Sequence, residues 1–400
     1  MSSLDAWATM IIMPSSFTEV TNTGYASRIK NAVVGGVVGV VLIPGSLMLL
    51  WMNEGNSAKS HAGLSELSKL AVTVPADRVD VENEGKPVHL TGKATTEEVL
   101  KDERFQVSAT ALRLTTRVEM FQWRESETTE TKTTAGGGEK TVTTYEYEKA
   151  WSLQPIDSSL FRHPEGHENP PMPYESAELL TKEATVGAFR LNEDLVRQIG
   201  GEIPLELTVD HRAALPEEMR EGLKDSDSGY YQGEDPSVPA VGDLRIAFSV
   251  VPPALISFIA KQQGDTFEAF VARNGKRFSP LRMGELSIEG VIAAERSDLK
   301  ILTWILRLVG LILMVIGFAM IFKPLAVVSS FLPFLGDIVA AGTFVMAILI
   351  SLGLSLTTIA VAWVFYRPLV GIPLLLVAVA FLMMALRKMG KAKKLRVATA

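Results

Sequence analysis

The sequence predicts a membrane protein with four transmembrane helices and a large extracytoplasmic α+β domain that contains an antiparallel sheet. Residues 301–386 are apolar except for four charged side chains, and another apolar run precedes Asn53. A bilayer core of about 30 Å is crossed by about 20 helical residues, so these stretches have room for four spans. Between them, apolar and polar residues alternate in several runs, which is typical of strands.

Proline and charge divide the apolar stretches into helices. The later breaks are predicted at Lys323-Pro324 and at Tyr366-Arg367-Pro368, because proline and charged residues end apolar helices. We predict a cytoplasmic tail at 1–30, transmembrane helices at 31–52, 301–322, 338–365 and 369–386, the extracytoplasmic domain at 53–300, a cytoplasmic or interfacial loop at 323–337, and a basic cytoplasmic tail at 387–400.

The charge distribution predicts the orientation in the membrane. Of 39 Lys/Arg and 45 Asp/Glu, 11 and 3 lie outside residues 52–300, which leaves 28 basic and 42 acidic residues, a net charge of −14, inside. The short segments that flank the spans are basic, including Arg28, Lys30 and six residues of the C-terminal tail. The positive-inside rule therefore places both termini in the cytoplasm and the domain on the other side.

The domain's elements follow from its residue patterns. Leucines at helical spacing predict a short amphipathic helix at 57–70, and Asn192 is the expected N-cap of a helix at 193–199. Two long antiparallel strands are predicted at 104–124 and 141–151, joined by a mobile Thr/Glu/Gly-rich tip at 126–140. Further strands are expected at 71–81, 87–92, 186–191, 203–209, 243–251, 255–260 and 266–272, and a helix at 285–300 that runs into the second span.

The sequence lacks the residues that several classes of function require. The chain has no cysteine, which removes disulfides, thiolate metal sites and cysteine nucleophiles, and its acidic domain argues against nucleic-acid binding. There is no Gly-x-Ser-x-Gly elbow, and Gly136-Gly137-Gly138 is not followed by the helix of a phosphate-binding loop. We therefore predict a protein that is not an enzyme, with no catalytic residue, no cofactor and no metal.

Histidines and intramembrane charges leave alternatives open. His163 and His167 have a helical metal-site spacing, but the surrounding Pro and Gly favour a structural loop. For Arg307, snorkelling to the interface is favoured over pairing inside the bundle. For Asp337, capping the N-terminus of the third span is favoured over an ion or proton role.

Two glycines are candidates for close helix packing. Gly35 and Gly39 form a Gly-x-x-x-Gly motif in the first span. Small residues let helix backbones approach, either within one molecule, the favoured alternative, or between copies.

The residues that end the first span resemble a known signature. Trp51-Met52-Asn53-Glu54-Gly55 is similar to the Asn-Glu-Gly signature of the LUMA family, also called the transmembrane protein 43 family, and residues 117–123 resemble its Val-Glu-Met-aromatic-Gln-Trp run. Other matching segments are the Trp151 region, Gly166-His167-Glu168-Asn169-Pro170, Gly242-Asp243-Leu244-Arg245 and Pro333-Phe334-Leu335-Gly336-Asp337. The resemblance covers residues 30–390.

The resemblance implies four spans, a large lumenal or periplasmic loop, and self-association that organises membrane protein complexes. Animal members sit in the endoplasmic reticulum and inner nuclear membrane. The absence of cysteine and the alanine-rich, acidic composition favour a bacterial source, and hence the inner membrane with a periplasmic domain.

We therefore expect a non-enzymatic, self-associating membrane scaffold whose partners are the lipid bilayer, other copies and other membrane proteins, with no nucleic acid. The alternatives are an oligomeric ion channel or transporter and, behind it, a membrane-bound lipid-related enzyme. The residues expected to carry structural or functional roles are Gly35, Gly39, Asn53, Glu54, Gly55, Arg307 and Asp337.

Overall fold

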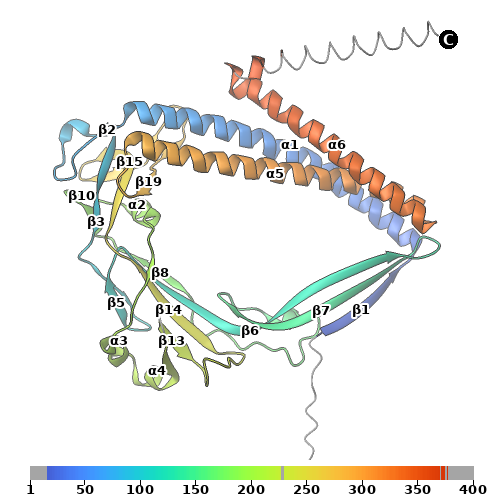
Figure 1. The fold of residues 1–400 in the computed structure, drawn as a ribbon, viewed down its shortest axis with the longest axis horizontal. Helices are drawn as coiled ribbons and strands as arrows, with labels where there is room; N and C mark the ends of the chain where they lie inside the picture. The colour runs from blue at the N-terminus through green and yellow to red at the C-terminus, as the bar shows by residue number, and fades with distance from the viewer. Residues whose placement is uncertain (1–15, 227–228, 370, 374–375, 377–400) are drawn as a thin grey trace, which may run out of the picture.

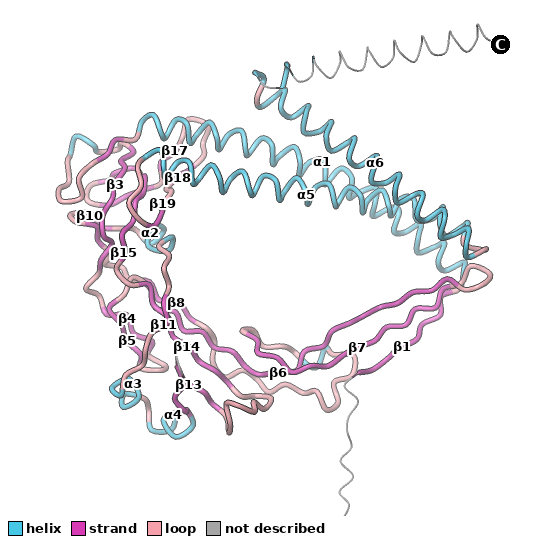
Figure 2. The backbone as a smooth tube through the Cα atoms, viewed as in Figure 1, coloured by secondary structure: helices cyan, strands magenta, loops and turns pink. Residues whose placement is uncertain are grey.

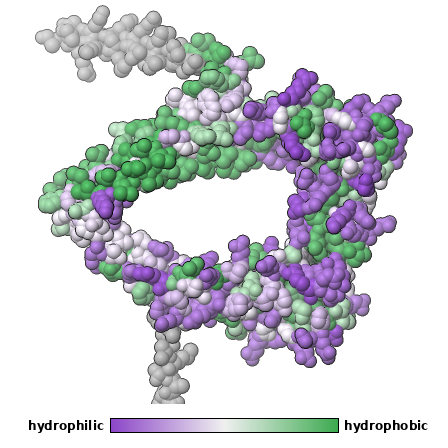
Figure 3. All heavy atoms as spheres, turned by 180° about the vertical axis from the view of Figure 1, so that it is seen from behind, coloured by the Kyte–Doolittle hydropathy of each residue, from purple (hydrophilic) through white to green (hydrophobic). Residues whose placement is uncertain are grey.

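The protein forms a closed ring. The computed structural model describes residues 16–226, 229–369, 371–373 and 376. Long helices form one side of the ring, two sheets form the next, and a narrow ribbon of strands returns to the far end of the helices (Figure 1). Figure 3 shows that the opening passes through the molecule, with apolar residues gathered on the helices and hydrophilic residues over the sheets.

Three helices in the described part of the chain are long and apolar enough to cross a membrane. They are α1 (Tyr25–Leu70), α5 (Ile288–Ser329) and α6 (Pro333–Tyr366). The prediction of long apolar helices beside a large antiparallel-sheet domain is thus confirmed. The predicted helix at 369–386 lies outside the described residues apart from 369, 371–373 and 376.

Helix α1 joins two elements that the sequence predicts as separate. It is continuous over 46 residues and includes both the predicted span at 31–52 and the amphipathic segment at 57–70. The predicted break after Met52 is wrong because the polar residues that follow are buried against α5 and α6 instead of forming a loop.

Helices α5 and α6 also differ from their predicted bounds. Lys323-Pro324 does not end α5, which continues to Ser329, and α6 begins at Pro333, a residue type suited to a first helical position. Pro324 cannot donate a hydrogen bond to the carbonyl of Met320. Gly36 of α1 lies beside that oxygen, since a Cβ added to Gly36 would be 3.6 Å from it.

The larger sheet has eight strands, and its neighbouring strands are antiparallel. The order is β1-β7-β6-β14-β13-β12, with β8 paired to β6 and β11 paired to β14. The strands are β1 (Ser16–Thr23), β6 (Arg113–Thr133), β7 (Glu139–Ser152), β8 (Ala177–Leu180), β11 (Ile203–Pro204), β12 (Leu223–Ser226), β13 (Gly229–Gln232) and β14 (Leu244–Val251).

Strand β6 connects the domain to the ribbon. Its first part pairs with β14, from Arg113 to Met120, and its second part pairs with β7 as far as Thr133. Strand β1 adds to the other edge of β7. The resulting three-stranded extension, β1–β7–β6 beyond Met120, is called the ribbon below; it is the magenta arm of Figure 2.

The predicted mobile tip at 126–140 is wrong. The ladder between β6 and β7 continues through this segment to Thr133 and Glu139, so only residues 134–138 form the turn. Thr is β-branched and suits strands, whereas the prediction counted the Thr/Glu/Gly composition as a loop signal. Gly136 and Gly137 adopt φ of 81° and 76°, a region open to glycine, and so make the turn tight.

The smaller sheet has seven strands in the order β10-β9-β3-β15-β16, with β2 and β19 beside β3 and β15. Only the β2–β3 pair is parallel among its described pairings. The strands are β2 (Val72–Thr73), β3 (Pro87–Thr95), β9 (Thr185–Val186), β10 (Phe189–Arg190), β15 (Ala254–Gln263), β16 (Thr266–Glu268) and β19 (Leu281–Met283).

Shorter elements complete the domain. Two further hairpins pair β4 (Val99–Asp102) with β5 (Val107–Thr110) and β17 (Phe270–Val271) with β18 (Arg277–Phe278). The predicted helix with Asn192 as N-cap is α2 (Glu193–Gln198), and the Asn192 side chain accepts a hydrogen bond from Leu195 N. The predicted strands at 71–81 and 203–209 shrink to β2 and β11. The sequence missed α3 (Val209–Ala214), α4 (Glu217–Gly222) and the 3-10 turns Val81–Asn83 and Ser158–Leu160.

The helices are fixed to the domain at one end. Leu64 and Leu67 of α1 pack with Val291 of α5 and with Ile259 of β15 in one buried cluster. Gly63 lies so close to Phe278 that a Cβ would be 2.5 Å from its ring. The C-terminal part of α1 and the N-terminal part of α5 therefore rest directly on the smaller sheet.

The ribbon holds the other end. Residues 16–23, which belong to the predicted tail at 1–30, form β1 and pair with β7 from Ser16↔Glu146 to Thr23↔Glu139. Arg28 of α1 donates to the carbonyl of Gly137 in the turn at 2.6 Å and to Ser330 Oγ at 3.1 Å. The ring is thus closed by contacts between the start of α1, the end of α5 and the ribbon turn.

Candidate functional site: a buried ion pair where three helices meet

A charged residue pair joins α1 to α5 near the domain end of the bundle. Arg307 Nε and Nη2 lie 2.6 and 2.9 Å from Glu54 Oε1 and Oε2, which is a bidentate geometry. Glu54 is only 1% exposed. Helix α6 completes the cluster, because Trp363 Nε1 donates to Glu54 Oε2 at 2.7 Å.

The environment of Arg307 decides between its two predicted roles. Its guanidinium carbon lies 4.6 Å from the ring centroid of Trp304 and 5.7 Å from that of Trp363, so aromatic rings flank the charge. The side chain is engaged inside the bundle by Glu54. The favoured alternative of simple snorkelling is therefore wrong, and pairing inside the bundle is what the structure shows.

Each residue of the Asn53-Glu54-Gly55 segment meets a different neighbour. Asn53 Nδ2 donates to the carbonyl of Thr303 in α5 at 3.0 Å. Gly55 faces α6, where a Cβ would lie 2.8 Å from Cζ of Tyr366. Consecutive helical residues point in directions about 100° apart, so three positions suffice to contact two helices and the ion pair between them.

The polar side chains of this cluster can fix the positions of α1, α5 and α6 relative to one another. A buried charge without a partner is strongly destabilising, whereas this carboxylate receives three hydrogen bonds. Within the described residues, no group of three or more His, Asp or Glu side chains is arranged to hold a metal ion.

Gly35 and Gly39 face α5 of the same molecule. A Cβ on Gly39 would overlap the carbonyl oxygen of Gly317, and one on Gly35 would lie 3.6 Å from Cε of Met320. The structure therefore places the Gly-x-x-x-Gly motif at the α1–α5 crossing, the favoured of the two alternatives.

Asp337 does not cap α6. The N-cap is Leu332, and Asp337 lies exposed in the second turn, because the helix begins at Pro333, earlier than predicted. It lies at the opposite end of the bundle from the Glu54–Arg307 pair. The structure brings together Asn53, Glu54, Gly55 and Arg307, but not Asp337 or the two glycines.

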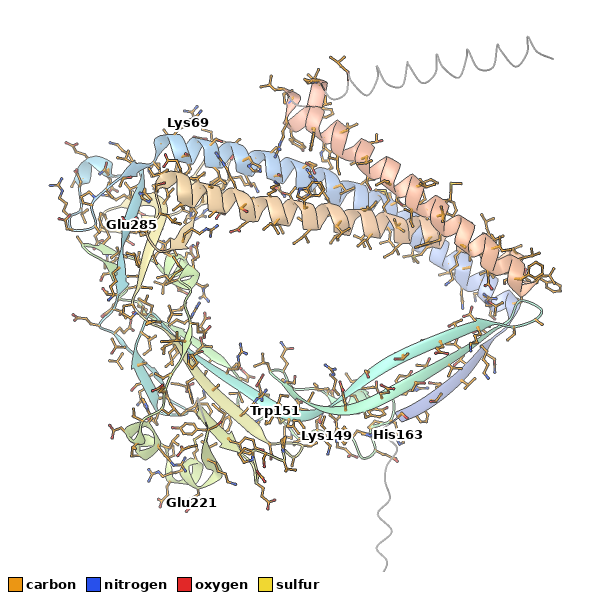
Figure 4. The ribbon with its side chains drawn as sticks, viewed as in Figure 1. Lys69, Lys149, Trp151, His163, Glu221 and Glu285 are labelled. Atoms are coloured by element: carbon orange, nitrogen blue, oxygen red, sulfur yellow. The ribbon has the colours of Figure 1, made fainter. Side chains whose placement is uncertain are left out.

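His163 and His167 belong to a loop that braces the base of the ribbon. The His167 ring stacks on Tyr147 with centroids 4.0 Å apart, and its Nδ1 lies 3.2 Å from the His163 carbonyl oxygen. Asn169 pairs with both the N–H and the carbonyl of Trp123 on β6. Figure 4 shows His163 beside Lys149 and Trp151 of β7, on the ribbon side of the ring. The segment Gly166-His167-Glu168-Asn169-Pro170 is therefore a structural loop, the favoured of the two alternatives.

The sequence analysis does not pair Arg307 with Glu54. Glu54 lies just after the predicted first span, and Arg307 lies within the first turns of the predicted second span. Both residues therefore lie near the same predicted membrane face, as does Trp363 at the end of α6. Matching depth between an acid and a base on neighbouring spans is the signal that could have found the pair.

Comparisons with known proteins show which family this chain belongs to. The family model described as Transmembrane protein 43 matches residues 120–368. Proteins named Transmembrane protein 43 from Rattus norvegicus and Homo sapiens are 31% and 30% identical over 358 residues, which covers 86% of this chain and 88% of each relative. The Transmembrane protein 43 homolog of Drosophila melanogaster is 29% identical over 347 residues, 84% of this chain and 90% of the fly protein. No solved structure matches at a significant level. The chain belongs to the transmembrane protein 43 family.

Proposed function

We propose that this protein is a non-enzymatic membrane scaffold that self-associates and organises other membrane components. The observation that carries the proposal is the chemistry of the ribbon. Residues 126–132 of β6 are all exposed, and Thr, Glu, Ser or Lys occupies every one of these positions, so both faces of the strand are polar. The helices across the opening are apolar (Figure 3).

A bilayer placed across the apolar helices would also meet the ribbon. The ribbon turn contacts Arg28 at one end of the bundle, and the domain that carries the ribbon packs against α1 and α5 at the other. Polar groups that face lipid without partners cost several kcal/mol each. Copies that turn their apolar helices outward and gather their ribbons around water avoid this cost, which supports self-association.

The proposed orientation places the body of domain 53–300 outside the cytoplasm and the basic tail at 387–400 inside, as the positive-inside rule favours. The β1–β7 pairing changes the proposal for the N-terminal segment: Ser16 lies beside Glu146, back along the ribbon from its turn, so residues 16–23 would lie level with the helices and not in the cytoplasm. For a bacterial source the membrane is the inner membrane; for a eukaryotic source it is the endoplasmic reticulum or inner nuclear membrane, with a lumenal domain.

Labelling tests the orientation, because the natural chain has no cysteine. In a bacterial host, a membrane-impermeant maleimide added outside spheroplasts should label Glu221→Cys on the exposed helix α4 (Figure 4). A reporter that is active only outside the cytoplasm should be silent when fused after Ala400. The opposite pattern would reverse the orientation.

Crosslinking tests self-association. In native membranes, Thr128→Cys in the ribbon should give crosslinked oligomers with a bifunctional maleimide, because the proposal gathers ribbons together. Glu221→Cys, far from the ribbon, is the matched control and should give much less. A wild-type protein that is monomeric by light scattering in mild detergent, together with no crosslink at Thr128→Cys, would contradict the scaffold.

A pore is the second candidate, because ribbons gathered around water would enclose a polar passage. The hydroxyls of α6 do not favour a passage through a single copy: Thr357 and Thr358 bond the carbonyls of Gly353 and Leu354 in their own helix. We expect no selective current in planar-bilayer recordings. A current whose selectivity changes in Glu130→Gln, Arg307→Gln or Asp337→Asn would replace the scaffold with a channel.

A further inference from the structure

A small cavity lies beside the Glu54–Arg307 pair on its domain side. Its volume is about 200 Å³, and α1, α5 and α6 all contribute to it. It is lined by Ser57, His61, Lys300, Thr303, Trp304, Arg307, Trp363 and Arg367.

The lining is basic. Lys300, Arg307 and Arg367 contribute three cations, and the lining contains no carboxylate. The charge of Arg307 is compensated by Glu54, with which it forms an ion pair. Among the described residues, Lys300 and Arg367 form no ion pair, and Arg367 Nη2 donates only to the neutral Ser57 Oγ, at 3.2 Å. The chain after Arg367 contains no Asp or Glu that could supply the missing charge.

The cavity lies at the level where a lipid headgroup would be. Trp304 is 59% exposed at its rim, and Trp is typical of the interface between lipid and water. Ile301 and Leu308 of α5 and Phe365 of α6 are exposed apolar side chains near the lining residues in sequence. A group that enters from the bilayer would therefore bring an acyl chain along an apolar surface while its headgroup reached the cations.

We propose that this cavity binds the phosphate group of an anionic phospholipid, with Lys300 and Arg367 as its charge partners and Ser57 as a neutral hydrogen-bond donor. Two uncompensated cations favour a headgroup of net negative charge over a zwitterionic one. The volume accommodates a headgroup but not acyl chains, which would lie along the outer surface of the helices. This binding site does not depend on self-association.

The test compares the full-length protein in phosphatidylcholine nanodiscs with and without phosphatidylglycerol, followed by native mass spectrometry of the lipids retained after extraction. Wild type should retain phosphatidylglycerol in preference to phosphatidylcholine. The double variant Lys300→Gln/Arg367→Gln should lose that preference by at least about tenfold, since each basic residue near the membrane surface contributes measurably to anionic-lipid binding.

The matched control is Lys59→Gln/Lys69→Gln, which removes the same charge from exposed positions of α1 outside the cavity. It should retain the preference of wild type. Lys300→Arg/Arg367→Lys keeps the charges and should retain it within about threefold, which separates loss of binding from loss of folding.

Three results would overturn the proposal. They are no preference in wild type, an equal loss in the Lys59/Lys69 control, and an unchanged preference in Lys300→Gln/Arg367→Gln. Inorganic phosphate provides the remaining comparison: if it raises the Tm of wild type in detergent but phosphatidylglycerol is not retained, the site takes a soluble anion and the lipid assignment is wrong.

Discussion

Arg28, in the first turns of α1, forms an ion pair with Glu139 at the start of β7, with Nε 2.9 Å from the carboxylate oxygen. Both side chains are largely buried, at 11% and 28% exposure, because the ribbon turn, α1 and the end of α5 meet around them. This pair fastens the ribbon to the end of the helices that is remote from the domain. Together with the Arg28–Gly137 hydrogen bond and the β1–β7 ladder, it joins the ribbon to the helices.

A cysteine pair tests whether β1 stays paired with β7 in the membrane. Val20 of β1 lies opposite Val142 of β7, so Val20→Cys/Val142→Cys should form an intramolecular disulfide in native membranes under mild oxidation. Val20→Cys/Glu130→Cys is the control, because Glu130 pairs with Val142 from the other side and lies two strands from Val20. A failure of the first pair to crosslink, with both proteins folded, would show that β1 leaves the ribbon in the membrane.

Breaking the Glu54–Arg307 pair should destabilise the protein strongly, and the effects of the two substitutions should not add. Glu54→Gln or Arg307→Gln alone leaves an unpaired buried charge and should lower the free energy of unfolding by about 3–5 kcal/mol. The double variant Glu54→Gln/Arg307→Gln should be less destabilised than the sum of the two single variants, because neither charge is left alone.

The control for this cycle is an exposed pair. Arg190 and Asp265 are 63% and 50% exposed, so water screens their pair and Asp265→Asn should destabilise the protein much less than either single variant of the buried pair. Thermal or denaturant unfolding in a single detergent supplies both measurements. Additive single-variant effects would mean that the two charges act independently, contrary to the bidentate geometry.

The sequence predicted the helices better than it predicted their interactions. Hydropathy and length identify apolar helices because a bilayer imposes both. By contrast, β1 has only Phe17 and Val20 as large apolar residues, and its strand conformation depends on pairing with β7, more than a hundred residues later. Local patterns cannot supply such a partner.

Distant partners also explain why the candidate site could not be predicted from the sequence. The Asn53-Glu54-Gly55 segment was recognised as a motif, but its meaning depends on Thr303, Arg307 and Tyr366 from two other helices. The sequence showed which residues were unusual. Only the crossing of the three helices shows that they bind one another.

Lowering the pH should destabilise the folded domain, in part because Asp102 becomes protonated. Burial raises the pKa of this carboxyl, but hydrogen bonds from Arg104 and Thr116 outweigh burial and hold the pKa below its ordinary value. A depressed folded-state pKa adds stability above the unfolded-state value of about 3.9 and loses it as the pH falls through the folded-state value.

Asp102→Asn should therefore destabilise the protein at neutral pH, and the difference from wild type should shrink as the pH falls below about 4. Asp157→Asn is a useful comparison because the Asp157 carboxylate lies in an exposed loop and, among the described residues, accepts hydrogen bonds only from Ser159. These bonds also lower its pKa, so the variant shows how much an exposed carboxylate contributes to the same pH dependence. Unfolding curves across pH supply the measurement. A difference between Asp102→Asn and wild type that stays constant with pH would show that the carboxylate charge is not what stabilises the fold there.

Gly39 separates packing within a molecule from packing between copies. A Cβ at this position would overlap the carbonyl of Gly317, so Gly39→Ala should force α1 and α5 apart and lower the Tm. At Gly45, on the same helix, an added Cβ would meet no described atom within 4 Å apart from its own neighbouring residues and helix backbone, so Gly45→Ala should be neutral or stabilise by up to about 1 kcal/mol. Thermal unfolding and light scattering should be recorded together for both variants. If Gly39 instead served an interface between copies, Gly39→Ala would dissociate the oligomer while its monomer kept the wild-type Tm, and the α1–α5 crossing described here would be wrong.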